Sequence, residues 1–312
     1  MKKIILPFFA VFFCSSIVFT GCKEIGPNIN LNPGSTAAVV DSGYMLTPTQ
    51  IASLTTDAHN VLVEEFTGQG CSNCPAAHAV LDGIVLSNTG RVNVIGIYPS
   101  GVEQAVPPPT HKYDFRDSIG VFIPNYVAGI SISALPSAFI DRVPASGNME
   151  IDGSAAWSGI INGRLPLTDS VNLALQSSYD ATTTMATITA TITYTHPVST
   201  KQNLSVVIVE DSMVDIQEYP TGFGAYPSGY DSSYVFTSVF RYMVSSIPAG
   251  DPILDTVAVK ATGRVLRRTY NYKLKTKTPA VNTSQCRVIA FINSNNGTDV
   301  HILQSTQTKL MQ

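Results

Sequence analysis

Residues 61–81 read VLVEEFTGQGCSNCPAAHAVL, and this pattern is the main indication of the fold of the N-terminal part of the chain. It opens with a short apolar run of the kind that forms a buried strand, and it closes with apolar residues at helical spacing. Cys71 and Cys74 lie between the two runs. A second run rich in Val and Ile, RVNVIGIY at 91–98, follows. The order strand, helix, strand predicts a parallel unit with the cysteine pair at its first junction.

A cysteine pair at a strand-to-helix junction is typical of thiol–disulfide exchange. Amide N–H groups at the start of a helix lack intrahelical partners and stabilise a nearby thiolate. We therefore predict that Cys71 is an exposed nucleophile and that Cys74 resolves the mixed disulfide. Glu65, on the preceding strand, could accept or relay the proton that the resolving thiol loses. A partly exposed carboxylate with no such role is an equal alternative for Glu65.

Two other interpretations of the cysteine pair stay open. Cys71, Cys74 and His78 have a spacing that would place three ligands for zinc or copper on one helical face. A closed structural zinc site needs a fourth ligand, however, and the sequence has no second CxxC and no HxxxH. Covalent haem would need histidine where Pro75 stands. The pair could also be an inert disulfide, although so short a loop contributes little stability. We predict no metal and no cofactor.

The N-terminus is typical of a secretory signal. Lys2 and Lys3 precede a short apolar run, and Thr20-Gly21-Cys22 resembles the cleavage site of a bacterial lipoprotein. The resemblance implies that residues 1–21 are removed and that Cys22 is acylated, which would anchor the chain in a membrane. A soluble secreted protein is the alternative. Residues 22–45, rich in Asn, Gly, Pro and Ser, are predicted to be a tether.

Composition and periodicity predict two domains. The chain has 312 residues, 44% of them hydrophobic and 13% charged, with a formal net charge of −3. It is therefore globular, and with no basic run beyond Arg267-Arg268 we expect no nucleic-acid partner. After residue 166 the pattern becomes strictly alternating, as in MATITATITYT at 185–195. Alternating strands separated by turns predict a β-sandwich over 167–312.

Three features lie outside the cysteine motif. Trp157, the only tryptophan, is predicted to pack in a core. Cys286 is expected inside a β-strand and unreactive. Residues 218–236 carry six aromatic side chains among glycines and prolines. Such a loop could bind a sugar or a partner protein, but we favour the interpretation that its aromatic residues fix it to its own domain.

VLVEEFTGQGCSNC resembles the active-site strand and turn of the thioredoxin family, with Glu65 where that family has a buried acid. LPSAFIDR at 135–142 is similar to its later loop and strand. The resemblance implies that Pro136 is a cis-proline that lies against the cysteines and presents backbone to a bound extended chain. Gly70 stands where the family usually has Trp, and Ser72-Asn73 is not one of its well-known dipeptides, so no reduction potential carries over.

LVEEFTGQGCSNCPAAH, LPSAFIDR and LSVVIVEDSMVDIQ together resemble a narrower group, the outer-membrane lipoproteins related to the twenty-eight-kilodalton outer-membrane protein of certain Gram-negative bacteria. This likeness implies an α/β thioredoxin-like domain at 46–166 followed by a β-rich domain. It also implies a location at the outer membrane and does not specify the periplasmic or the external face. The predicted function is thiol–disulfide exchange on envelope proteins. The alternative is a surface binding or assembly protein in which the Cys71–Cys74 disulfide is only structural.

Overall fold

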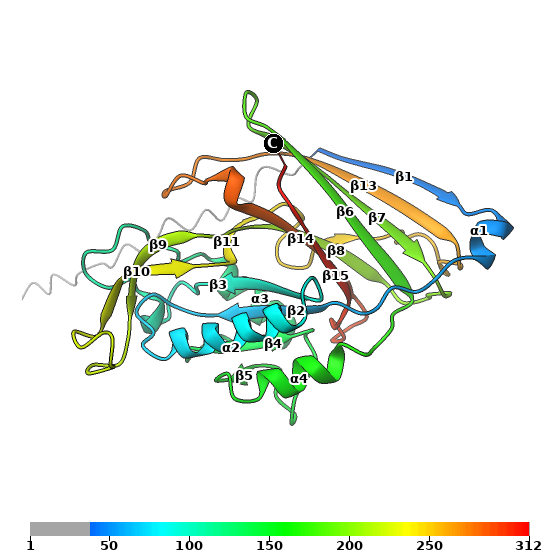
Figure 1. Ribbon diagram of the computed structural model, residues 1–312. Helices are drawn as coiled ribbons and strands as arrows, with labels where there is room; N and C mark the ends of the chain where they lie inside the picture. The colour runs from blue at the N-terminus through cyan, green and yellow to red at the C-terminus, as the bar shows by residue number, and fades with distance from the viewer. Residues whose placement is uncertain (1–37, 312) are drawn as a thin grey trace, which may run out of the picture.

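The computed structural model describes residues 38–311, which form sheets of nine, four and two strands (Figure 1). The predicted signal sequence and the predicted lipidation site Cys22 lie outside the described residues. The helices are α1 (Pro48–Ala52), α2 (Cys74–Ser87), α3 (Ile119–Ala128) and α4 (Trp157–Arg164), with short 3-10 turns at Glu103–Ala105 and Thr283–Gln285. Among the residues described, no helix is long and apolar enough to cross a membrane.

The nine-stranded sheet contains the predicted parallel unit. Its strands are β2 (Val61–Phe66), β3 (Val92–Ile97), β4 (Ser137–Ile140), β5 (Ile151–Asp152), β8 (Gln202–Glu210), β11 (Val239–Met243), β12 (Asp251–Pro252), β14 (Cys286–Ser294) and β15 (Ile302–Lys309). β2 and β3 are parallel, with Val61 opposite Val92, as predicted. β3 also pairs with β11 at Gly96 and Val239. Strands from both sides of residue 166 therefore share one sheet, and the domain boundary stays a prediction.

The four-stranded sheet packs against β8, β11 and β14 of the large sheet. Its order is β1 (Ala38–Met45), β13 (Arg264–Lys273), β7 (Met185–Tyr194) and β6 (Val171–Asp180). The predicted alternation of β7 is confirmed, because every second residue from Ala186 to Tyr194 is buried. Ile188 and Tyr270 of this sheet share a core with Val206 and Val288 of the large one. The C-terminal part is thus β-rich, with two sheets packed face to face.

Part of the predicted tether is in fact a strand. β1 pairs along its whole length with β13 in an antiparallel ladder, from Ala38 opposite Asn271 to Met45 opposite Arg264. Asp41 adds an ion pair with Arg268, with 2.6 Å between Oδ2 and Nη2. The Asn- and Pro-containing composition that suggested a tether belongs to the sequence before β1, whereas β1 itself reads AVVDSGYM and is an edge strand. The sequence pattern could not reveal the partner strand far along the chain.

Helices cover both faces of β2, β3 and β4 (Figure 1). α2 and α4 pack on one face, where Trp157 is fully buried, as predicted. α3 packs on the opposite face through Ile119, Ile123 and Val127. α3 continues through Pro124, which lies inside the helix. Burial of this apolar face compensates for the one helical hydrogen bond that the proline removes.

The two remaining strands form a separate hairpin. β9 (Met213–Glu218) and β10 (Tyr230–Phe236) pair with each other and stand outside both larger sheets. Figure 1 shows them beyond the large sheet, at the end of the molecule where α2 begins. The hairpin lies between β8 and β11 in the sequence, and these two strands are neighbours in the nine-stranded sheet. The hairpin is therefore an insertion between them.

Candidate redox site

Cys71 and Cys74 form a disulfide at the start of α2, with 5.4 Å between their Cα atoms. The helix begins at Cys74, and Cys71 belongs to the turn before it. The side chains are not accessible: Cys71 is 2% exposed and Cys74 is 0% exposed. The prediction of an exposed Cys71 at the helix N-terminus is therefore wrong for this state of the molecule, because neighbouring segments cover the turn on two sides.

The first cover is the segment that follows β3. A Cβ atom added at Gly68 would lie 2.2 Å from the carbonyl oxygen of Gln104, and one added at Gly70 would lie 2.4 Å from that of Val106. Both contacts are far too close for a side chain, so the two glycines let the backbones meet. This approach also explains why Gly70 replaces the thioredoxin-type Trp, for which there is no room.

The second cover is the β9–β10 hairpin. The side-chain amide of Gln217 donates to the backbone oxygens of Gly68 at 3.2 Å and Cys71 at 3.0 Å. The amide of Glu218 donates to the backbone oxygen of Gln69 at 2.8 Å. Three carbonyls of the cysteine turn are thus bonded to a segment that lies about 150 residues further along the chain.

Asp215 fixes the hairpin to the same region. Its carboxylate accepts from the amides of Lys112 at 2.9 Å and Tyr113 at 2.7 Å, and from the side chain of Gln69 at 3.1 Å. Both Gln69 and Asp215 are buried. Hydrogen bonds between buried groups of this kind hold the turn at Gln69, the segment at Lys112 and Tyr113, and the hairpin together beside the cysteines.

Glu65 lies buried on the face of β2 that α2 covers. It is 4% exposed, and its Oε1 has no hydrogen-bond partner within the described part of the chain. Burial, and secondly the negative charge of Asp82, raise the pKa of Glu65 to about 8. Glu65 is therefore largely protonated at neutral pH and can give or take a proton near that pH. The alternative of a partly exposed carboxylate does not apply.

His78 lies beside Glu65, one helical turn after Cys74. Its Nε2 atom is 3.4 Å from Glu65 Oε1 and 2.8 Å from the Thr67 hydroxyl, and its Nδ1 atom is 2.6 Å from the Tyr234 hydroxyl. Burial lowers the pKa of His78 to about 4, so His78 and Glu65 meet as neutral groups and not as an ion pair. Glu65, His78 and Tyr234, together with Asp82, line a cavity of about 270 Å3.

These contacts bear on the metal alternative. Cys71 and Cys74 are bonded to each other, and both ring nitrogens of His78 have other neighbours. In residues 38–311 no three His, Cys, Asp or Glu side chains come together in a way that could hold a metal ion.

Pro136 follows a cis peptide bond, as the thioredoxin resemblance implied. Leu135, on the other side of that bond, shares a hydrophobic core with Cys71 and Cys74. The carbonyl of Pro136 accepts from the amide of Gly153 at 2.9 Å, and its ring is half-buried. The structure thus brings the loop that contains Pro136 to the core that holds the disulfide.

Cys286 lies in a strand, as predicted, but part of the predicted aromatic loop is the strand β10. Cys286 is the first residue of β14, is unpaired and buried, and burial raises the pKa of its thiol to about 12. Tyr219 stacks on Tyr226, with 4.4 Å between the ring centroids, and Tyr234 packs on Phe236 at 4.8 Å. The loop also reaches beyond its own sequence region, because Phe236 packs on Phe115 at 5.0 Å.

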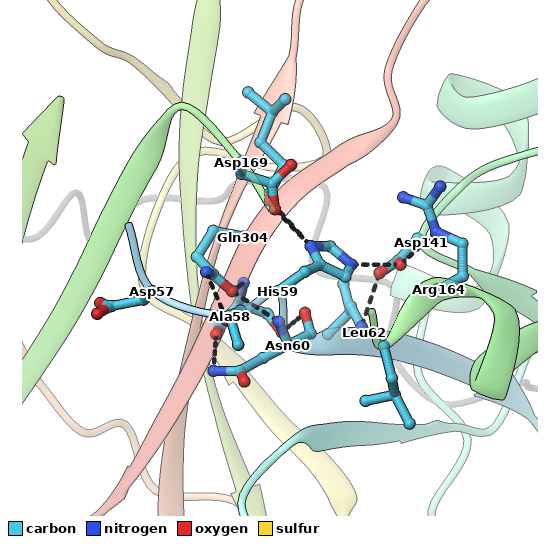
Figure 2. A network of polar contacts seen from close by, with 12 residues as sticks. Asp57, Ala58, His59, Asn60, Leu62, Asp141, Arg164, Asp169 and Gln304 are labelled. Carbon is cyan, nitrogen blue, oxygen red and sulfur yellow. Dashed lines mark hydrogen bonds and ion pairs between the residues drawn. The ribbon is translucent and has the colours of Figure 1, made fainter. Parts of the chain in front are cut away.

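Sequence analysis missed a buried ionic network at the junction of the two sequence regions (Figure 2). His59, which precedes β2, has Nε2 2.6 Å from Asp141 and Nδ1 2.5 Å from Asp169. Arg164, at the end of α4, also contacts Asp141 at 2.8 Å. Burial alone would lower the pKa of His59, but hydrogen bonds and the charges of both aspartates outweigh it and raise the pKa to about 9. No spacing rule links residues so far apart in the sequence.

A second ion pair was also missed. Arg142, next to Asp141, forms a bidentate contact with Glu64 of β2, with 2.6 Å from Nη2 to Oε1 and 2.8 Å from Nε to Oε2. Both side chains are fully buried. The pair stands next to Glu65 in sequence but on the opposite face of the strand, because successive side chains of a strand alternate. Its role is structural.

The fold and the site define a β-rich protein with a disulfide-bonded CxxC turn. The family model described as "Outer membrane protein Omp28" matches residues 124–312. The chain therefore belongs to the Omp28 family, and the protein is an outer-membrane protein of that family.

One solved structure has a similar overall fold. HBP35 of Porphyromonas gingivalis is similar with a TM-score of 0.60 and 17% identity over 82% of this chain and 77% of that one. A domain of the outer membrane lipoprotein Omp28 from the same organism matches with a TM-score of 0.28 and 12% identity over 46% of this chain and 89% of that one. At this identity the first likeness concerns the fold alone. No curated protein matches the sequence.

Proposed function

We propose that this outer-membrane protein exchanges thiols and disulfides with other proteins of the cell envelope through Cys71 and Cys74. The observation that carries the proposal is the disulfide between β2 and α2, which follows the strand that holds the buried, protonatable Glu65. The parallel pairing of β2 with β3 supports a thioredoxin-like domain at 46–166. Acylated Cys22 would hold the protein on the membrane.

The exchange needs no cofactor. When the pair oxidises a partner, a partner thiolate attacks the sulfur of Cys71, the Cys71–Cys74 bond breaks, and Cys74 leaves as a thiolate that takes up a proton. A second partner thiolate then attacks the partner sulfur of the mixed disulfide, and Cys71 leaves. Two electrons pass from the partner, whose two thiols become a disulfide, to the Cys71–Cys74 pair. The same steps in reverse reduce a partner disulfide.

Glu65 and Pro136 would assist this chemistry. Glu65 gives Cys74 its proton when that sulfur leaves and removes it when the sulfur attacks, a task that suits an acid whose pKa is about 8. Pro136 would present backbone to the partner chain next to the sulfurs.

Equilibration with glutathione tests the proposal. The mature protein would be incubated in mixtures of reduced and oxidised glutathione, quenched with an alkylating reagent and weighed by mass spectrometry. We expect a reversible transition of Cys71 and Cys74 with a potential between about −270 and −120 mV, the range of exchange proteins. A potential below about −300 mV, typical of structural disulfides, would argue against exchange.

The burial of both sulfurs favours a second candidate, a binding or assembly protein of the outer membrane with a structural disulfide. In that case the β-rich part would contact the partner, and the Cys71→Ser, Cys74→Ser double variant would lose stability but keep its partner. The glutathione titration separates the two candidates.

A further inference from the structure

The β9–β10 hairpin is joined to the nine-stranded sheet only at its base. The backbone takes positive φ at Ser212 (59°) and Ser238 (57°), the positions where the hairpin leaves and rejoins that sheet. Asp211 closes this base, because its carboxylate accepts from the amide of Ser238 at 2.8 Å and from Arg287 Nε at 2.6 Å. The base is therefore fixed, whereas the body of the hairpin belongs to neither large sheet.

The body of the hairpin bonds the cysteine turn through backbone acceptors. Gln217 and Glu218 supply the donors, and the carbonyl oxygens of Gly68, Gln69 and Cys71 accept. An extended polypeptide that binds a protein through its main chain donates its N–H groups to backbone carbonyls of the protein. The hairpin thus occupies the hydrogen-bonding groups that a partner chain would need beside Cys71.

The two covers of the turn differ in how firmly they are attached. The Gln104–Val106 segment meets Gly68 and Gly70 backbone to backbone, with no space left between them. The hairpin side includes a defect, because Gln217 Oε1 is buried without a hydrogen-bond partner among the described residues. An unsatisfied buried acceptor opposes the closed arrangement. The hairpin is therefore the cover whose attachment a side-chain substitution such as Gln217→Ala can weaken.

We propose that the β9–β10 hairpin occupies the surface on which an extended polypeptide partner contacts the cysteine turn, so that the hairpin and the partner compete for it. The partner is a chain that donates backbone N–H groups to Gly68, Gln69 and Cys71 and carries a cysteine that reaches Cys71. The inference rests on the proposed function for the chemistry of that partner. The occupied surface itself rests on the hydrogen bonds.

The test measures access to Cys71 in mature protein that carries Cys74→Ser, which leaves Cys71 as a free thiol. One probe is iodoacetamide. The other is a short unstructured peptide whose cysteine is disulfide-bonded to thionitrobenzoate. The Cys71 thiolate, once its proton has gone to solvent, attacks the peptide sulfur and releases the thionitrobenzoate thiolate. Both rates are compared with and without Gln217→Ala.

Gln304→Ala is the matched control. Gln304 is also a buried strand glutamine that bonds backbone, accepting from the amide of Asn60 at 2.9 Å and donating to the carbonyl of Ala58 at 3.2 Å, but it lies on β15. Cys286, buried in β14, reports unfolding of the whole chain in the same samples.

We expect Gln217→Ala to raise both rates at Cys71 about tenfold, the factor that about 1.4 kcal/mol of lost hydrogen bonding produces. Gln304→Ala should leave both rates unchanged, and Cys286 should stay protected. Unchanged Cys71 rates in Gln217→Ala would overturn the proposal. So would a faster reaction with iodoacetamide alone, or Cys286 reacting together with Cys71, since the hairpin would then open only with the whole fold. Measuring these rates requires no redox equilibrium. The proposed competition between hairpin and partner can therefore be contradicted whatever the glutathione titration shows about thiol–disulfide exchange.

Discussion

Glu65 shows what one residue's position in the sequence can and cannot reveal. Its place six residues before Cys71, on a strand that leads to the turn, indicates a proton carrier. Sequence alone left a partly exposed carboxylate as an equal alternative, because burial depends on α2 and Tyr234, which arrive from elsewhere in the fold. The structure buries Glu65, and desolvation then favours its protonated form.

Glu65→Gln should slow the step in which Cys74 attacks the mixed disulfide between Cys71 and glutathione. In the wild type we expect this rate to rise with pH through about 8, where Glu65 becomes able to accept the proton. Without the carboxyl group the rate should fall about a hundredfold, the lower end of typical general acid–base contributions. Rapid-quench alkylation measures it.

Glu150→Gln is the control for that experiment, because Glu150 is another carboxyl group whose pKa is raised by burial, and it bonds Ser137 at 2.8 Å instead of lining the cavity. If Glu65→Gln kept the wild-type rate and pH profile, Glu65 would have no part in proton transfer.

At the scale of elements, local periodicity predicted most strands and helices. The run VLVEEF, the alternation in β7 and the hairpin of β14 and β15 all follow from patterns that a few neighbouring residues carry. β1 escaped prediction because an edge strand needs only one partner, and that partner lies more than 200 residues away. The cover over Cys71 escaped for the same reason, since no local pattern shows where a hairpin docks.

The network around His59 joins the ends of several elements and predicts a pH dependence of stability. The pKa of His59 is about 9 in the folded protein, above the ordinary value of 6.5, so the folded state binds the proton of His59 more tightly than the unfolded state does. The resulting stabilisation is complete below about pH 6.5 and is lost as the pH rises through about 9. Its size is of the order of 3 kcal/mol.

His59→Gln should therefore reduce the free energy of unfolding most strongly below about pH 6.5 and much less above about pH 9. Denaturant unfolding at both pH values gives the difference. His196→Gln, which removes an exposed histidine, serves as the control. Equal destabilisation by His59→Gln at the two pH values would show that His59 is not the charged centre of the network.

At the scale of the whole molecule, the two sequence regions are one packed structure. β3 meets β11 in the large sheet, and Leu62 and Ile95 share a core with Val207 and Phe291. Sequence periodicity separated a mixed region from an alternating one, but it could not show that their strands pair. This joining places a hairpin of the C-terminal region on the CxxC turn, so the site is complete only in the full chain.

Trapping of partners in cells tests whether Cys71 and Cys74 exchange disulfides with envelope proteins. Cys74→Ser removes the resolving thiol, so a partner bound to Cys71 should stay attached as a mixed disulfide. We expect adducts of the mature protein on non-reducing gels that disappear with reductant, increase with Gln217→Ala and are absent when Cys71→Ser is added. If no adduct forms, even with Gln217→Ala and with Cys71 reactive toward iodoacetamide, Cys71 and Cys74 do not exchange disulfides with envelope proteins.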